Sequence, residues 1–143
     1  MFDEIVDLES IHKQKCEISE RELKLSAPKL NDLKLIPTIY TWFCEFHNSG
    51  HYKNNVVQLR KQFVFIILYL YFPQKLACGG RMLNGLRDTL SDVIGLSAKT
   101  IISNDSNRLI VDYRTYKDFQ TSVDQAYTFI MGRLEESNVW VIV

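Results

Sequence analysis

The chain has 143 residues, with 17 Lys and Arg balanced by 17 Asp and Glu, so its formal net charge at pH 7 is zero. Apolar residues make up 46% of the chain and charged residues 24%; this globular composition excludes a disordered tail, a collagen-like chain and a coiled-coil rod. The length predicts one domain, residues 1–143, with residues 1–18 left open as a flexible N-terminal arm. Zero net charge at first speaks against nucleic-acid binding, because strong binders usually carry a basic surplus.

The cysteines and the apolar runs predict the compartment. Cys16, Cys44 and Cys78 are odd in number and widely spaced, which does not resemble a disulfide framework. The acidic start of the chain lacks the order of a signal peptide. The longest apolar run, residues 63–72, is about half the length that a membrane span needs. We therefore expect a cytoplasmic protein that does not associate with membranes.

The N-terminal third predicts two helices. The segment that begins at Ser19 has a capping-box pattern and predicts a short helix that Pro28 interrupts. A second helix is expected from Pro37 to His47, since Pro suits the first helical position, and residues 48–50 end it. This helix carries a dense aromatic cluster that serves either as core or as a face for a protein partner: Tyr40, Trp42, Phe43 and Phe46.

Residues 55–72 are predicted to form the central buried element. Their apolar side chains follow helical spacing, although residues 63–72 are also rich in β-branched and aromatic residues and a buried strand stays open. Pro73 is expected to stop this helix. Gly79-Gly80 marks a loop in which the backbone can take positive φ. A turn accounts for this loop better than a phosphate-binding loop does, because the usual Lys-Ser/Thr pair and the preceding strand are missing.

The second half of the chain predicts further helices. One covers residues 86–94, the next begins at Ala98, and residues 108–113 form either a strand or a helical continuation. The last helix starts at Thr115 or Asp118 and continues to about Leu134. The fold class is therefore mainly all-α, a bundle of five or six helices around the 55–72 helix, with one short β element left open.

One stretch carries a more specific pattern. In residues 86–106, Leu90 and Ile94 supply the inner face of a first helix, Gly95 allows the turn, and Ile101 anchors a second helix to the core. This pattern resembles the helix-turn-helix of DNA-binding proteins, whose second helix lies in the DNA major groove. Asn104 departs from it, because the family usually has an apolar residue at that position.

The resemblance implies which residues contact double-stranded DNA. Lys99 neutralises phosphate or reads guanine, and Ser or Thr bonds to base edges or phosphates. Ser97 and the adjoining backbone N–H groups offer donors to a phosphate. Arg81 and Arg87 are candidate phosphate clamps. The predicted DNA-binding residues, with those of the second helix expected to face outward, are Arg81, Arg87, Ser97, Lys99, Thr100, Ile102 and Ser103. A helix pair with a purely structural role is the open alternative.

The charges are unevenly distributed along the chain. Residues 1–50 hold six basic and nine acidic residues, a net −3, and residues 119–143 hold one and three, a net −2. Residues 51–118 hold ten basic and five acidic residues, a net +5, and include the helix-turn-helix pattern. A neutral chain can therefore still present a local basic surface to DNA.

A second resemblance rests on five short segments: Arg60-Lys61-Gln62-Phe63, Gly79-Gly80, Gly85-Leu86-Arg87, Thr100-Ile101-Ile102-Ser103 and Tyr116-Lys117-Asp118-Phe119. They are similar to segments of small proteins carried by phages and mobile elements of gut bacteria. The resemblance implies a source, and with DNA binding it implies regulation of transcription or replication in such an element.

Other activities have less support in the sequence. Cys44, His47 and His51 have a metal-like spacing, but only three ligands are evident, and a buried Cys beside surface His residues is favoured. No acid–base or nucleophile set is apparent, so we expect no enzyme, no cofactor and no metal. We expect a homodimer through the last helix or the apolar tail, residues 139–143. The alternative is an interaction adaptor or inhibitor that binds a protein partner through the acidic N-terminal region or that tail.

Overall fold

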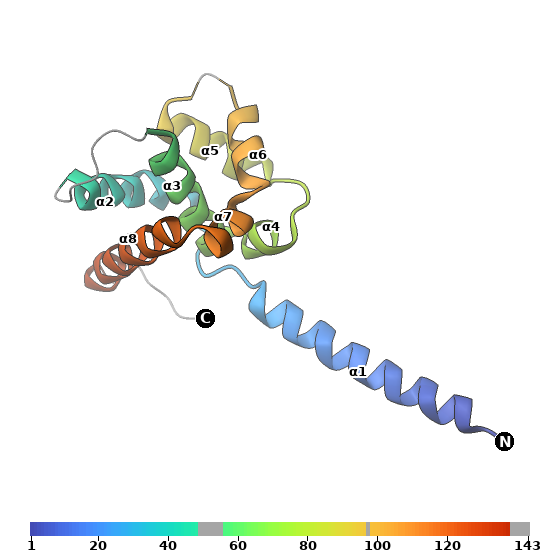
Figure 1. Cartoon of the computed structure of the whole chain (residues 1–143). Helices are drawn as coiled ribbons and strands as arrows, with labels where there is room; N and C mark the ends of the chain where they lie inside the picture. Colours follow the sequence, from blue (N-terminus) through green and yellow to red (C-terminus); the bar gives the residue numbers. More distant parts are fainter. Residues whose placement is uncertain (49–55, 97, 138–143) are drawn as a thin grey trace.

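The computed structural model describes residues 1–48, 56–96 and 98–137. Within those ranges the chain contains eight α-helices, one 3₁₀ helix and no strand (Figure 1). The all-α prediction is confirmed, although the described residues form more helices than the five or six predicted, and residues 108–113, which the sequence left open, are mostly helical. The elements are α1 (Asp3–Leu25), η1 (Leu33–Leu35), α2 (Ile36–Asn48), α3 (Val56–Tyr71), α4 (Pro73–Cys78), α5 (Asn84–Ile94), α6 (Thr100–Ser106), α7 (Leu109–Thr115) and α8 (Lys117–Glu136).

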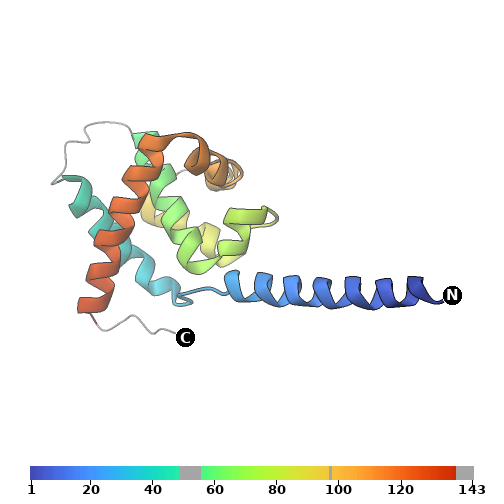
Figure 2. The same ribbon diagram turned by 60° about the horizontal axis from the view of Figure 1, so that its bottom comes forward.

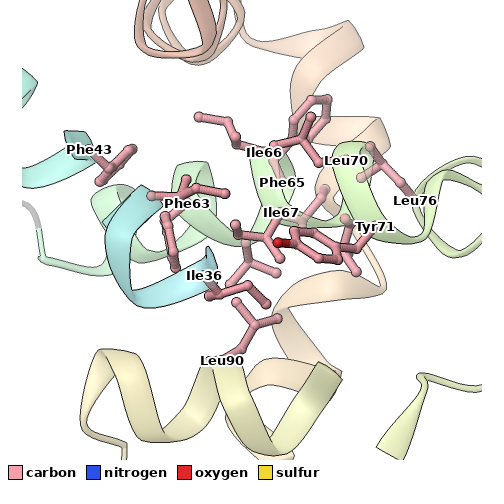
Figure 3. Packing of buried hydrophobic residues seen from close by; sticks show 14 of the residues in the cluster. Ile36, Phe43, Phe63, Phe65, Ile66, Ile67, Leu70, Tyr71, Leu76 and Leu90 are labelled. Atoms are coloured by element: carbon pink, nitrogen blue, oxygen red, sulfur yellow. The ribbon is translucent and has the colours of Figure 1, made fainter. Parts of the chain in front are cut away.

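Helix α3 is the centre of the bundle, as its sequence predicts. Its residues 62–68 are all buried, so the helix is covered on every side. Helices α2, α4, α6, α7 and α8 all pack against it. Figure 3 shows its side chains meeting those of α2 on one side and Leu90 of α5 on another. The helical spacing of residues 55–72 therefore predicts this element correctly, and the strand alternative is wrong.

Helices α2 and α8 pack on each other and on α3. The Phe63 ring of α3 lies 4.8 Å from the Tyr40 ring and 5.4 Å from the Phe43 ring, measured between centroids. Much of the aromatic cluster of α2 is therefore core. The apolar stripe of α8 includes Val123 and Ile130, and both are buried inside the bundle. This stripe stabilises the fold itself, and a dimer through the last helix stays a prediction.

Short connections close the bundle at the C-terminal end of α3. The backbone carbonyl of Leu70 accepts hydrogen bonds from the amides of Lys29 and Leu30, at 2.8 and 3.0 Å. Pro73 ends α3 and also becomes the first residue of α4, where its missing N–H costs nothing. The positive φ expected in the following loop is present, at 80° and 97° for Gly79 and Gly80.

Helix α1 is longer than the sequence predicts. It starts at Asp3, so Ser19 lies inside it and does not cap it, and residues 3–18 are helical. None of its residues is buried, and Figures 1 and 2 both show it extending away from the bundle. Acidic residues in the first turn and Lys24 in the last turn complement the helix dipole. Helix formation here follows from local propensity and charge, since no packed face stabilises it.

No helix in the described part of the chain is both long enough and apolar enough to cross a lipid bilayer. The predicted apolar tail, residues 139–143, lies outside the described residues, as does His51.

Candidate nucleic-acid interface

Helix α5 ends in a turn whose backbone conformation is the one that the sequence predicts. Gly95 has φ 81° and ψ 37°, in the left-handed region. The amides of Gly95 and Leu96 both donate to the carbonyl of Ser91, each at 2.9 Å, which is how helices commonly end. The Ser91 side chain is only 3% exposed and its hydroxyl donates to the Leu96 carbonyl at 3.4 Å. A small residue is therefore needed at position 91, because the turn folds back over it.

The residues that α5 and α6 bury against the bundle agree with the prediction on α5 but not on α6. Leu90 is buried as expected, but Ile102, predicted to face DNA, is 0% exposed. Ile101, predicted to anchor the core, is only half-buried. Helix α6 begins at Thr100, two residues later than predicted, and its buried residues, Ile102 and Ser106, lie one turn apart on the face that meets the core. Ile102 is therefore a core residue and not a DNA contact.

Polar residues lie on the outer face of α6. Lys99 and Thr100 are exposed, as predicted, and so are Asn104 and Asn107. Residues 104–106 are helical, and α6 ends at Ser106. Asn104, a departure from the apolar family pattern, is thus an outward-facing residue one turn after Thr100. Ser97, at the start of the predicted recognition helix, lies outside the described residues.

An ion pair links the two helices on their exposed side. The Lys99 ammonium lies 2.8 Å from the Asp88 carboxylate, and the two side chains are 51% and 45% exposed. Exposed pairs of this kind contribute about 0–1 kcal/mol to stability. Asp88 therefore does little for the fold, but it reduces the positive charge that Lys99 would present to a phosphate.

A second, less exposed ion pair fixes the position of α6. Arg60 of α3 donates from Nε to Asp105 Oδ2 at 2.6 Å and from Nη2 to Oδ1 at 3.2 Å. The two side chains are 16% and 9% exposed. A paired guanidinium and carboxylate fix orientation as well as distance. The sequence does not predict this pair, because 45 residues separate its members and no local pattern joins them.

The predicted phosphate clamps, Arg81 and Arg87, lie near Lys75 of α4. Arg81 is exposed in the loop after Gly80, and Arg87 of α5 is half-buried. Nη1 of Arg87 lies 3.5 Å from the Ser103 hydroxyl, a long hydrogen bond, and Ser103 is half-buried as a result. Lys75 of α4, which no sequence pattern singles out, lies in the same region and is 4% exposed.

The metal-like spacing around α2 does not produce a cluster in the described residues, among which no three His, Cys, Asp or Glu side chains are placed to hold a metal ion. His47 is buried against the rings of Phe43 and Phe46, with centroids 4.4 and 5.1 Å away. Burial lowers the pKa of its imidazole, because the charged form loses hydration. His47 is therefore not the surface histidine that the sequence suggested.

An apolar groove and an uncovered apolar helix lie away from α5 and α6. The groove has a volume of about 740 Å³ and is bordered by the C-terminal part of α1 and by α3, α4, α7 and α8. Large apolar side chains on α1 are more than half exposed. Helix α1 therefore carries several large apolar side chains that its own chain does not bury. The exposed apolar residues of α1 are Ile5, Val6, Leu8, Ile11, Ile18, Leu23 and Leu25.

Comparison of the chain with known protein families, with curated proteins and with solved structures finds no match.

Proposed function

We propose that the protein binds double-stranded DNA through α5 and α6. The observation that carries this proposal is the polar outer face of α6 on a helix pair whose turn has the left-handed glycine of a helix-turn-helix. Helix α6 is anchored on its inner face by Ile102 and held to α3 by the Arg60–Asp105 pair. A rigid support of this kind is what a helix needs to keep its register in a groove.

The side chains on this face suit groove recognition. Asn binds the N6 and N7 edge of adenine through two hydrogen bonds, so Asn104 is the residue we assign to bases. The side-chain oxygen of Asn107 already accepts a hydrogen bond from Lys75. Thr100 and Lys99 lie at the start of the helix, where contacts to the phosphate backbone and to base edges meet. Arg81 and Arg87 are the proposed phosphate contacts. Of the predicted residues, this set keeps Arg81, Arg87, Lys99 and Thr100, leaves out Ser97, Ile102 and Ser103, and adds Asn104.

Titration of a labelled duplex against the protein at several salt concentrations tests the proposal. Binding to phosphates releases counterions, so the logarithm of the association constant should fall linearly with the logarithm of salt concentration, with a slope of about −0.9 for each phosphate contacted. Absence of binding to any duplex at low ionic strength, or binding that does not depend on salt, would overturn it.

The variant Asn104→Ala separates a recognition surface from a structural helix pair. Asn104 is exposed, so its truncation should leave the melting temperature unchanged while it weakens binding to the preferred sequence about 5–100-fold, the effect of losing a paired base contact. A matched control is Asn31→Ala, also exposed and placed between α1 and η1, away from α6. Its affinity for DNA should equal that of the wild type.

We also propose, as a second candidate, that α1 carries self-association or a protein interaction. The exposed apolar residues of α1 favour this, since a helix that buries nothing in its own chain has a face free for a second copy. A dimer would also double the contacts of a single short recognition helix with DNA. The apolar tail stays a predicted partner surface.

The double variant Ile11→Glu/Ile18→Glu tests self-association by sedimentation. It should convert a dimer into a monomer without changing the melting temperature, because neither side chain is buried. The matched control is Lys13→Glu, on the same helix and also exposed, which should stay dimeric. A wild-type protein that is monomeric at every concentration would overturn self-association. A role in regulating a phage or mobile element rests on the sequence resemblance alone.

A further inference from the structure

A small polar pocket opens between the α4–α5 loop and α6, on the Arg87 side of the helix pair. Its volume is about 230 Å³, less than the roughly 300–1,000 Å³ of sites for drug-sized ligands. It is therefore a size for a small ion and its waters. The residues that line it come from three elements and the loop between α4 and α5: Lys75, Gly80, Arg81, Met82, Arg87, Ser103 and Asn107.

The charges of this pocket are unbalanced. Lys75, Arg81 and Arg87 contribute three cationic side chains, and no carboxylate is among the lining residues. None of the three makes an ion pair with another described residue. Arg60, another cation that is largely shielded from solvent, is paired with the Asp105 carboxylate. Buried charges normally have a counter-charge, so the composition of this pocket suits an anionic ligand.

Lys75 is the most deeply placed of the three cations. It is 4% exposed, and its ammonium donates to the Gly80 carbonyl at 2.6 Å and to Asn107 Oδ1 at 3.2 Å. Both partners are neutral, and an ammonium has three donors. These bonds hold the ammonium in place and leave one donor and the full positive charge for a ligand. Positive φ at Gly80 is part of the loop conformation that directs its carbonyl to Lys75.

Arg87 provides a second, independent indication of a ligand. Its Nε is buried from solvent and has no hydrogen-bond partner among the described residues. A buried donor left unsatisfied is uncommon in native proteins, because it loses its hydration without replacement. Its Nη1 reaches only the Ser103 hydroxyl, at 3.5 Å. A tetrahedral oxyanion would accept from this guanidinium through two oxygens, as phosphate does.

We propose that this pocket binds a phosphate-class oxyanion, with Arg87 and Lys75 as its main ligands, Arg81 closing the exposed side and Ser103 donating its hydroxyl. The proposal does not depend on DNA binding by α6. Two kinds of ligand carry such a group: a free phosphate-bearing small molecule, and a phosphodiester of a DNA backbone. Asn107 lines the pocket and is exposed directly after the end of α6. The pocket therefore lies next to the proposed DNA-binding face, where a backbone phosphodiester could enter it.

Titration of the full chain with inorganic phosphate, followed by calorimetry and by melting temperature at constant ionic strength in a chloride background, tests the proposal. Specific binding should give a saturable heat and a saturable rise in melting temperature. Phosphate also stabilises proteins weakly and without saturation through exclusion from their surface. A rise that stays linear with concentration, with no heat of binding, would overturn the site.

Two variants locate the effect. Arg87→Gln should weaken phosphate binding about tenfold or more, since it removes a charged hydrogen-bond donor. Arg81→Gln changes an exposed loop residue, keeps the fold, and should weaken binding as well. Arg114→Gln is the matched control on exposed α7 surface and should bind phosphate as the wild type does. Equal phosphate affinity in Arg81→Gln, Arg87→Gln and Arg114→Gln would overturn the assignment.

Competition between phosphate and duplex DNA, again at constant ionic strength, distinguishes the two kinds of ligand. If the ligand is a DNA phosphodiester, saturating phosphate should weaken duplex binding. Arg87→Gln should then bind both phosphate and duplex DNA more weakly than the wild type does. If it is a free phosphate compound, duplex affinity should not respond to phosphate. Both results support the pocket. A protein that binds DNA but not phosphate would contradict the pocket alone, and the reverse would contradict only the function proposed for α6.

Discussion

Two hydrogen bonds join the guanidinium of Arg60 on α3 to the carboxylate of Asp105 on α6, at 2.6 and 3.2 Å. They tie the short helix that carries the proposed recognition face to the most buried helix of the bundle. Helix α6 has only seven residues, too few to be stable alone. Its position therefore depends on this pair and on the burial of Ile102 and Ser106.

Loss of one member of this pair should destabilise the fold strongly. Asp105→Ala leaves a mostly buried guanidinium without its counter-charge, and we expect the free energy of unfolding to fall by about 2–4 kcal/mol. Urea denaturation measures it. Asp88→Ala is the matched control, because it breaks an exposed ion pair that contributes about 0–1 kcal/mol. Similar losses in the two variants would show that Arg60 does not anchor α6.

Replacement of Gly95 and of Gly132 by alanine should change the free energy of unfolding in opposite directions. Gly95 has positive φ, and a Cβ added there would meet open space, so Gly95→Ala strains only the backbone and should cost about 1–2 kcal/mol. Gly132 lies inside α8 with equally open space, and Gly132→Ala should stabilise by about 0.5–1 kcal/mol. Thermal or urea unfolding measures both. A stabilised Gly95→Ala would contradict the turn described between α5 and α6.

The alkaline stability of the protein should depend on Tyr127. Burial, followed by the neighbouring Tyr69, raises the pKa of Tyr127 to about 12, against about 10 in the unfolded chain. The folded state therefore binds the phenolic proton more tightly, and this contribution is complete below pH 10 and is lost as the pH rises toward 12. Tyr127→Phe should lose less stability over that interval in urea titrations at each pH. An unchanged slope would contradict the burial of the hydroxyl.

Removal of α1 should leave the bundle folded. None of its residues is buried, and the hydrogen bonds from Lys29 and Leu30 to Leu70 lie after it in the chain. A chain of residues 27–143 should therefore unfold with a free energy within about 1 kcal/mol of the full chain, as expected for a segment with few stabilising contacts. Cooperative unfolding by circular dichroism measures it. A loss of several kcal/mol would mean that α1 packs on the bundle.

Features that depend on local sequence were predicted well. Helical spacing located α3, proline and the aromatic cluster located α2, and glycine located the positive φ of Gly95. Helix α1 was predicted too short because it has no apolar stripe of the usual width and its apolar residues stay exposed. Periodicity detects helices that bury a face, and this helix buries none.

The candidate site was predicted only in part, for a reason of register. Ile102 is buried and Ile101 is half-buried, the reverse of their predicted roles. Successive residues are about 100° apart around a helix, and the sequence of this short helix does not specify which of the two neighbouring isoleucines meets the core. The pairing of Arg60 with Asp105 and the meeting of Lys75 with Asn107 are long-range contacts. They follow from the packing of α4 and α6 on α3, which no local pattern specifies.

The affinity of the full chain for duplex DNA, with and without the charge of Asp88, is the decisive measurement for DNA binding through α5 and α6. Asp88→Asn releases Lys99 from its exposed ion pair and removes a negative charge from the proposed DNA-binding face. We expect tighter binding, with the salt dependence steeper by about 0.9 because one more phosphate is neutralised. Failure of both proteins to bind any duplex at low ionic strength, or equal affinity and equal salt dependence, would contradict DNA binding through α5 and α6.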